Sequence, residues 1–300
     1  MKPKVTIGVC VRNTASTIRG VIESIYAQDY PHELIEVIFV DDGSVDKTLS
    51  IIKEYAAKLD MKVKIFHHEW RGLGVSRNIV VNGASGKYII WIDGDMFIPK
   101  DHIKKQVEFM EKHPNVAVGK ARCALYDTNN IVAYLENISA MIEFTNEGSR
   151  ATYKLLGAGG AIYRSIAIKS VGGFNEEIKG SCEDIDAEFR MRGAHWKLCI
   201  TPAIFYERRR ETWKSLWDEY FWHGIGGHFI KNAIKSTSYT RIKFFPPTAV
   251  LILVSHSIRA YKIFHKKKVF FLPFHWIFKR IAWLCGFLTG DLRIKNLKAR

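Results

Sequence analysis

The sequence predicts an α/β protein in which a mixed, mainly parallel sheet is flanked by helices. Short runs rich in β-branched residues alternate with helical runs, the loops between them are short, and two of the apolar runs end in carboxylates. The 300 residues, 47% hydrophobic and 25% charged, are ample for a buried core. The five cysteines are odd in number and scattered, and the N-terminus has no signal-peptide pattern. We therefore expect a globular protein without a disulfide framework, in a reducing, cytoplasmic compartment.

The first ninety residues are expected to supply four strands with a helix after each of the first three. The expected strands are 5–11, 35–40, 63–66 and 88–92. Asn13 or Thr14 is expected to cap the first helix, and Asp46 opens the second, which runs to about Leu59. The third helix follows a glycine-containing loop at 71–74. This alternation indicates parallel pairing of the strands.

Carboxylates follow two of these strands. Asp41 and Asp42 end the second strand, and Asp93-Gly94-Asp95, an Asp-x-Asp (DXD) motif, ends the fourth. Either cluster alone reads as a turn, because Asp and Gly are common turn residues. Ligands of open α/β sheets bind beyond the carboxyl ends of the strands, so both clusters are expected at one edge. Asp93 and Asp95 therefore predict a hard, oxygen-rich site for Mg²⁺ or Mn²⁺, which the first cluster at the same edge supports.

The middle of the chain is expected to continue with a helix from Pro99 to about Lys112, a strand near 116–123 and a helix over 131–144. The small residues 157–161 let the backbone approach a ligand or another strand closely. A further helix then opens with four acids, which are Glu183, Asp184, Asp186 and Glu188. Acids in a first turn also stabilise the helix dipole, which accounts for some of the four.

These motifs together carry a family resemblance. In chain order they are Arg12-Asn13, Asp41-Asp42-Gly43-Ser44 with Asp46, Arg71-Gly72 with Arg77-Asn78, Asp93-Gly94-Asp95, Gly159-Gly160-Ala161 with Arg164, Gly172-Gly173-Phe174, and Glu183-Asp184 with Arg190. Over roughly residues 3–225 the chain resembles the family 2 inverting glycosyltransferases, which have the nucleotide-diphosphosugar-binding GT-A fold. Each motif alone is weak, whereas their order and spacing together are specific.

The resemblance implies a role for each part. The nucleotide of the donor would be bound by Asp41, Asp42, Arg12, Arg71, Arg77 and Asp93. Asp95, assisted by Asp93, would bind the metal ion that neutralises the leaving diphosphate. Asp184 would be the general base, with Glu183 holding the acceptor or orienting the base, and Asp186 and Glu188 on the solvated helix face. The acceptor or diphosphate region would include Gly159, Gly160, Arg208 and Arg209.

Two departures from the family pattern bear on function. Members often carry a His near the metal, and Glu207 stands in that place here, followed by Arg208-Arg209-Arg210. Processive polysaccharide synthases carry a Gln-x-x-Arg-Trp motif, but the last Gln of this chain is Gln106. Addition of a single sugar is therefore favoured over a processive synthase. A sugar-nucleotide nucleotidyltransferase is the other alternative, although residues 11–15 lack the phosphate loop it would need.

The last third of the chain is strongly basic. Residues 1–200 hold 26 Lys/Arg and 25 Asp/Glu, whereas residues 201–300 hold 19 and 5, which places nearly all of the net charge of +15 there. The apolar run 244–254 is about half the ~20 residues needed to span a bilayer. The run 269–288 is long enough but has Lys279-Arg280 in its middle, at about 2.5–3.5 kcal/mol each. Helices lying in the membrane interface, with Trp276, Phe278 and Trp283 buried in it, are therefore favoured over a clean span, and nucleic acid is a poor candidate.

The sequence thus predicts a GT-A catalytic domain at 1–212 and a basic, aromatic membrane-associating region at 213–300. The expected activity is transfer of one sugar from a UDP- or GDP-sugar, with Mg²⁺ or Mn²⁺. A polyprenyl or dolichyl phosphate, or a lipid-linked or cell-surface glycan precursor, is the expected acceptor. The expected partner surface is an anionic membrane, at the cytoplasmic face of the cell membrane.

Overall fold

The computed structural model describes residues 2–143, 152, 154–178, 180–230 and 246–298, and the chain divides into two compact units. Unit 1 comprises Met1–Ala124, Asn146–Glu177 and Glu183–Glu207. Unit 2 comprises Leu125–Thr145, Ile178–Cys182 and Arg208–Arg300. Unit 2 thus takes in two stretches from the middle of the chain. The predicted domain boundary after residue 212 stays a prediction.

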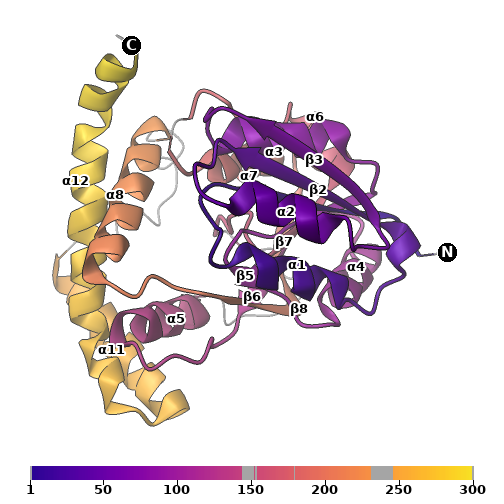
Figure 1. The fold of residues 1–300 in the computed structure, drawn as a ribbon. Coiled ribbons are helices and arrows are strands. Elements are labelled where there is room, and N and C mark those ends of the chain that lie inside the picture. Colours follow the sequence, from indigo (N-terminus) through magenta and orange to yellow (C-terminus); the bar gives the residue numbers. More distant parts are fainter. Residues whose placement is uncertain (1, 144–151, 153, 179, 231–245, 299–300) are drawn as a thin grey trace. The chain divides into compact units, whose positions relative to one another are not determined.

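Unit 1 is built on a mixed sheet, whose eight strands within the described residues follow the order β3-β2-β1-β4-β7-β6-β8-β5 (Figure 1). The strands are β1 Val5–Val11, β2 Ile35–Asp42, β3 Lys62–His68, β4 Tyr88–Trp91, β5 Met96–Phe97, β6 Val116–Cys123, β7 Ala161–Arg164 and β8 Lys197–Glu207. β1 pairs in parallel with β2 and β4, and β2 with β3, whereas β7 runs antiparallel to β4 and β6. The predicted mixed α/β fold is confirmed.

Helices flank this sheet, and all but α6 and η1 stand where the sequence predicts a helix. They are α1 Ile18–Tyr26, α2 Thr48–Ala56, α3 Leu73–Gly83, α4 His102–Lys112, α6 Ser165–Ser170 and α7 Glu183–Gly193, with the short 3₁₀ helix η1 at His32–Leu34. The apolar face of α1 is buried as its spacing predicts. The predicted cap of α1 is wrong: Thr17 is the N-cap residue, and the Asn13 side chain instead accepts a hydrogen bond from the Val45 amide at 2.9 Å.

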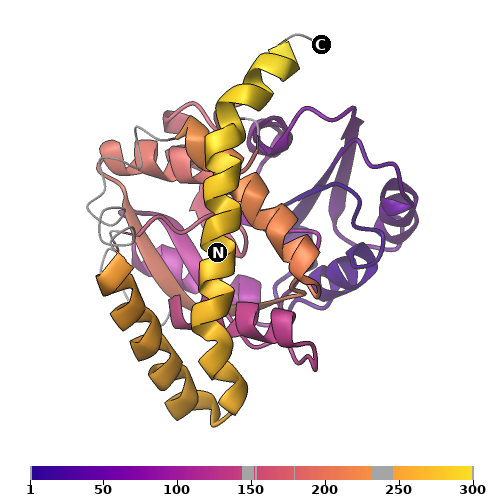
Figure 2. The ribbon, with the colours of Figure 1, turned by 90° about the vertical axis from the view of Figure 1, so that its left-hand side faces the viewer.

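Unit 2 is helical in its described part. Its elements are α5 Ile131–Glu143, α8 Trp213–Phe229, α11 Pro246–Phe264, the 3₁₀ helix η2 Lys267–Phe271 and α12 Leu272–Lys298. α11 and α12 form a helical hairpin whose turn is η2, as Figure 2 shows. The backbones of α8 and α12 approach so closely that a Cβ atom at Gly286 would collide with the Phe221 carbonyl. Among the described residues, no helix is both long and apolar enough to cross a bilayer. The predicted apolar run 244–254 begins outside those residues.

A buried polar cluster joins α5, α8 and α12 within unit 2. Lys279 Nζ donates to Glu136 Oε2 at 2.8 Å, and the Tyr220 hydroxyl donates to Glu136 Oε1 at 2.6 Å. His275 Nε2 lies 3.3 Å from Glu136 Oε2. The ammonium group of Lys279, which stands in the middle of the apolar run 269–288, therefore points into unit 2 and has a partner there.

Candidate active site

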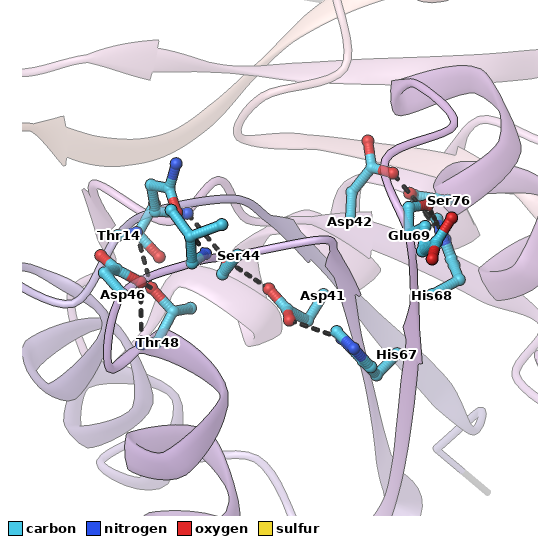
Figure 3. A network of polar contacts seen from close by, with 12 residues as sticks. Thr14, Asp41, Asp42, Ser44, Asp46, Thr48, His67, His68, Glu69 and Ser76 are labelled. Atoms are coloured by element: carbon cyan, nitrogen blue, oxygen red, sulfur yellow. Dashed lines mark hydrogen bonds and ion pairs between the residues drawn. The ribbon is translucent and has the colours of Figure 1, made fainter.

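The carboxyl end of β2 carries the first part of the candidate site. Asp41, which is fully buried, accepts hydrogen bonds from the Ser44 hydroxyl and from His67 Nδ1, the latter at 2.8 Å (Figure 3). The loop after β1 is tied to the loop after β2, because the Thr14 amide donates to the Thr48 hydroxyl at 2.8 Å. Asp46 accepts from the Thr48 hydroxyl and amide, and these bonds lower its pKa against the opposing effect of burial. Hydrogen bonds from two segments thus hold the carboxyl end of β2 in place.

Asp42 holds the loop that leads into α3. Its two oxygens accept the backbone amides of Arg71 at 2.8 Å and Gly72 at 3.1 Å, and His68 Nδ1 lies 3.3 Å away. A carboxylate has further lone pairs, so these bonds leave room for a ligand. Arg71 is exposed beside this loop, and the Arg12 guanidinium lies over the Trp70 ring at 5.5 Å. The structure therefore gathers Arg12, Arg71 and the two aspartates around the ends of β1 and β2.

The Asp-x-Asp motif lies just beyond β4. Glycine is required at position 94 by packing, because a Cβ atom there would come within 2.7 Å of Thr14 Cγ2 and 2.9 Å of Val11 Cγ1. Gly159 faces the motif, and a Cβ atom at that position would collide with Asp93 Oδ2. The Asp93 side chain is 39% exposed. Its carboxylate thus lies against the backbone of Gly159, where no larger residue would fit, and stays partly accessible to solvent.

Arg77 of α3 is the centre of an acid cluster. Its guanidinium is paired with Glu183, lies 3.4 Å from Asp184 Oδ2, and lies 3.9 Å from Asp93 Oδ1. The residue is only 3% exposed. Burial alone would lower the pKa of Arg77, but the three carboxylates raise it, so the guanidinium stays charged. The structure therefore brings together four of the predicted site residues, from α3, the β4 end and the start of α7.

The two neighbouring acids of α7 have different protonation. The Glu183 side chain is 1% exposed, and burial together with Asp184 and Asp93 raises its pKa to about 7, although Arg77 opposes that shift. The Asp184 side chain is 16% exposed and accepts the Ala158 amide at 2.9 Å. Burial opposes ionisation of Asp184 too, but Arg77 and the backbone hydrogen bonds lower its pKa. At neutral pH Asp184 is ionised, whereas Glu183 is only partly ionised and is the less accessible of the two.

A buried lysine shapes the glycine run opposite these acids. Lys120 Nζ of β6 donates to the carbonyls of Gly157, at 3.2 Å, and Gly159. Glu188 of α7 accepts the Leu156 amide at 2.5 Å and the Tyr163 hydroxyl at 2.8 Å. The expectation that Glu188 is solvated is wrong, since it is fully buried. Acids hold the amides of this loop and Lys120 holds its carbonyls, which fixes the loop at the Asp184 carboxylate.

Four residues of the site escaped the sequence reasoning. His67 and His68 could have been found, because parallel pairing of β2 with β3 sets Asp41 opposite His67 and Asp42 opposite His68. Lys120 and Glu188 had no such signal, since a lysine in a strand and an acid on a helix are ordinarily solvated. Their roles depend on the loop at 156–160, which is far from both in sequence.

The remaining predicted residues are Glu207, Arg208, Arg209 and Gly160. Glu207 ends β8 and is the register partner of Met96, the residue after Asp95. Arg208 and Arg209 belong to unit 2, where Arg208 lies 3.7 Å from Glu211. Gly160 donates its amide to the Trp91 carbonyl at 2.8 Å and has a positive φ of 70°, so it closes the glycine run onto β4.

A mixed sheet with acids at the carboxyl ends of its parallel strands is typical of ligand-binding α/β enzymes. Residues 6–167, more than half of the chain, match the model of glycosyl transferase family 2. The chain therefore belongs to glycosyl transferase family 2 and is a glycosyltransferase with the GT-A fold. The predicted family, fold and enzyme class are confirmed.

Curated relatives match only part of their length. The poly(ribitol-phosphate) β-N-acetylglucosaminyltransferase TarS of Staphylococcus aureus is 33% identical over 110 residues, 37% of this chain and 19% of TarS. The putative glycosyltransferase EpsH of Bacillus subtilis is 39% identical over 105 residues, 35% of this chain and 30% of EpsH. The matched stretch thus spans less than a third of either relative.

Solved structures are similar over nearly the whole chain. The mannosyltransferase PcManGT from Pyrobaculum calidifontis, in complex with GDP-Man and Mn²⁺, has a TM-score of 0.71 at 17% identity, over 97% of this chain and 87% of that one. The TarS structure of S. aureus has a TM-score of 0.55 at 20% identity, over 96% of this chain and 55% of that one. At these identities the likeness is one of fold.

Proposed function

We propose that this protein is an inverting glycosyltransferase that moves one sugar from a UDP- or GDP-sugar to a lipid-linked or cell-surface glycan acceptor. The observation that carries the proposal is the acid cluster around Arg77, in which Asp184 is ionised and accessible while Glu183 is buried. Two neighbours in fold are solved with GDP-Man or UDP-GlcNAc, which supports a nucleotide-sugar donor.

The donor would be bound along the carboxyl ends of β2 and β4. Asp41 and Asp42 are already braced by His67 and by the amides of the 71–72 loop, so their remaining lone pairs are pre-oriented for the N–H and O–H groups of a nucleoside. The Arg12 guanidinium lies over the Trp70 ring beside this edge, and Arg71 belongs to the loop that Asp42 holds. Guanidinium groups suit phosphate oxygens.

The residues present fit a divalent cation that arrives with the donor. Within the described residues no group of three or more His, Cys, Asp or Glu side chains forms a metal cage. Mg²⁺ and Mn²⁺ do not need one, because one or two carboxylates and the substrate phosphates suffice. Asp95 and Asp93 would hold the ion, and the Asp93 side chain is 39% exposed. When bound, the ion would neutralise the departing diphosphate.

Asp184 would take the acceptor proton. Its low pKa keeps it ionised at neutral pH, and its accessible carboxylate retains lone pairs after accepting the Ala158 amide. As the acceptor oxygen bonds to the anomeric carbon, its proton passes to Asp184 and the nucleoside diphosphate leaves with the electron pair of the broken bond. Glu183 contacts Arg77 and is 1% exposed, so it would position Arg77 and the base rather than accept the proton itself.

The experiment is a thermal-shift screen of the full chain against UDP- and GDP-sugars with and without Mn²⁺, followed by transfer to a hydroxyl group of a lipid-linked glycan. Asp95→Asn should lose the Mn²⁺-dependent shift. Asp184→Asn should keep that shift but lose transfer by about 10²–10⁴-fold. NMR of the product should show the inverted anomeric configuration.

Asp186→Asn is the matched control, because Asp186 lies on the same helix and is paired with Arg190 at 2.7 Å instead of with Arg77. It should transfer sugar at close to the rate of the unmodified chain. Full transfer by both Asp95→Asn and Asp184→Asn at saturating donor would contradict the proposal.

A further inference from the structure

Helix α12 has an inverted distribution of side chains. After Leu272, which is buried at its start, its buried face carries polar and small residues at helical spacing, namely His275, Lys279, Ala282, Gly286 and Gly290. Its exposed face, with η2, carries large apolar residues that are 44–67% exposed, and we call them the apolar stripe: Phe270, Phe271, Phe274, Ile277, Ile281, Leu284 and Leu288. A helix at the surface of a protein in water has the opposite arrangement.

The buried face is satisfied inside unit 2. Lys279 donates to Glu136 and lies over the Tyr220 ring at 4.8 Å, and Glu136 is only 6% exposed. Arranging charges inward with partners and apolar groups outward is typical of helices whose outer surroundings are apolar. The apolar stripe is thus not an accident of one or two exposed side chains.

The spacing of the stripe from Phe274 to Leu288 alternates between four and three residues, which keeps it on one face of α12. α11 adds exposed apolar residues to the hairpin, namely Val254, Ile258, Tyr261 and Ile263. Exposed apolar residues therefore occur on both arms of the hairpin that Figure 2 shows. Exposed apolar side chains in such number are typical of an interaction site.

Charge identifies the partner. The lysine trio, which we define as Lys266, Lys267 and Lys268, is exposed at the turn between α11 and α12. No Asp or Glu occurs between Glu219 and Asp291, whereas that stretch holds eleven Lys and Arg. A second copy of this surface would bring like charges together, which disfavours self-association. Anionic lipid headgroups are complementary to the lysine trio, and acyl chains are complementary to the stripe.

We propose that the α11–α12 hairpin docks on the surface of a membrane that contains anionic lipid, with the apolar stripe entering the boundary between headgroups and acyl chains and the lysine trio binding the headgroups. The rest of unit 2 packs on the other face of α12. Only the stripe therefore enters the lipid, and the hairpin lies in the plane of the interface. This inference uses none of the catalytic residues and stands apart from the proposed sugar transfer.

The test is flotation of the full chain with vesicles of phosphatidylcholine alone or with phosphatidylglycerol added. The unmodified chain should bind the anionic vesicles, and added salt should weaken that binding. The triple variant Phe271→Ser, Ile277→Ser and Ile281→Ser should lose roughly a hundredfold in partitioning. Serine at all three positions of the lysine trio should lower binding to the anionic vesicles by roughly a hundredfold and leave any binding to neutral vesicles unchanged.

Matched controls separate this surface from general hydrophobicity and charge. Val45→Ser with Ile166→Ser removes two apolar side chains of unit 1 that are 89% and 66% exposed, and should leave binding unchanged. Serine at the exposed Lys53, Lys58 and Lys100 is the control for charge. All altered residues are exposed, so circular dichroism and thermal melts should show folded protein.

Two results would overturn the proposal. One is that the unmodified chain does not bind anionic vesicles, or that the stripe variant binds them equally well. The other is a dimer, detected by light scattering without vesicles, that the stripe variant converts to a monomer, because a second copy would then cover the stripe. Asp184→Asn should bind vesicles like the unmodified chain, so a failure of this inference is distinguishable from a failure of the proposed activity.

Discussion

Both compact units bury a charge cluster, and the two clusters differ in their balance of charges and in their access to solvent. In unit 1 one cation, Arg77, meets three carboxylates. In unit 2 one carboxylate, Glu136, meets Lys279 and His275, and Arg209 also lowers its pKa. The acids of unit 1 are open in part, with the Asp93 side chain 39% exposed, whereas Glu136, Lys279 and His275 are all buried.

These differences indicate that the cluster around Arg77 serves ligand binding and that the cluster around Glu136 serves folding. One guanidinium cannot neutralise three carboxylates, so unit 1 keeps a negative excess at an accessible place, which a cation or a cationic transition state would relieve. The pair in unit 2 is closed to solvent and fixes α5 against α12. Buried ion pairs of that kind serve specificity of packing more than net stability.

The largest effect should come from breaking the cluster in unit 1. Arg77→Met leaves three acids without their cation, so we expect sugar transfer to fall below detection and the free energy of unfolding to drop by about 3–5 kcal/mol. Urea titration and transfer assays measure the two effects. Arg77→Lys keeps the charge but not the forked geometry, and should recover most of the stability and little of the activity. Unfolding of Arg77→Met at the same urea concentration as the unmodified chain would contradict the account.

A smaller effect is expected in unit 2. Glu136→Gln removes the charge partner of Lys279, although Ser139, at 3.3 Å, and the Tyr220 ring remain beside the ammonium group. We expect a loss of about 2–3 kcal/mol, with the donor-induced thermal shift retained. The double variant Glu136→Met, Lys279→Met should recover stability, because an apolar pair of similar volume avoids the burial of charge. A double variant whose loss is the sum of the two single losses would show that the pair is not coupled.

The two clusters should also respond oppositely to pH. Burial opposes ionisation of Glu136, but Lys279, His275 and Arg209 lower its pKa from 4.5 to about 2. The folded pKa lies below the unfolded one, so the stabilisation is complete above pH 4.5 and is lost as pH falls towards 2. Burial raises the pKa of Glu183 to about 7, so its penalty grows as pH rises from 4.5 to 7. Glu136→Gln should flatten the acid side of the stability curve and Glu183→Gln the neutral side.

The fold was predictable because its signals are local. β1 and β6 begin and end where their apolar runs do, at Val5–Val11 and Val116–Cys123. The paired aspartates at the end of β2 and the pair beyond β4 follow from strand order alone. The helix cap failed because Asn13 has a tertiary partner, the Val45 amide, that propensity does not foresee.

The burial of Lys279 in unit 2 and of Glu188 in unit 1 could not be predicted from local signals. Lys279 reads as an interruption of an apolar run, and only its partner Glu136, 143 residues earlier, makes burial favourable. Glu188 reads as solvated, and only the loop at 156–160 supplies the amide that holds it. The burial of Lys279 and that of Glu188 both depend on contacts distant in sequence. The positions of the motif acids can be predicted, because chain order alone places them at one edge of the sheet.

The smallest effect tests whether Arg77 is alone in governing the acids of unit 1. Lys120 is a second buried cation there, and its charge lowers the pKa of Asp184 in addition to Arg77 and the backbone hydrogen bonds. Lys120→Met should lower kcat on the order of tenfold by loosening the Gly157–Gly159 loop, with little change in KM for the donor. It should also move the acid limb of the kcat profile to higher pH, since Asp184 loses a favourable charge. If Lys120 had only a structural role, Lys120→Met would leave the acid limb of the kcat profile in place. The control Lys112→Met, at an exposed position, should also leave it in place.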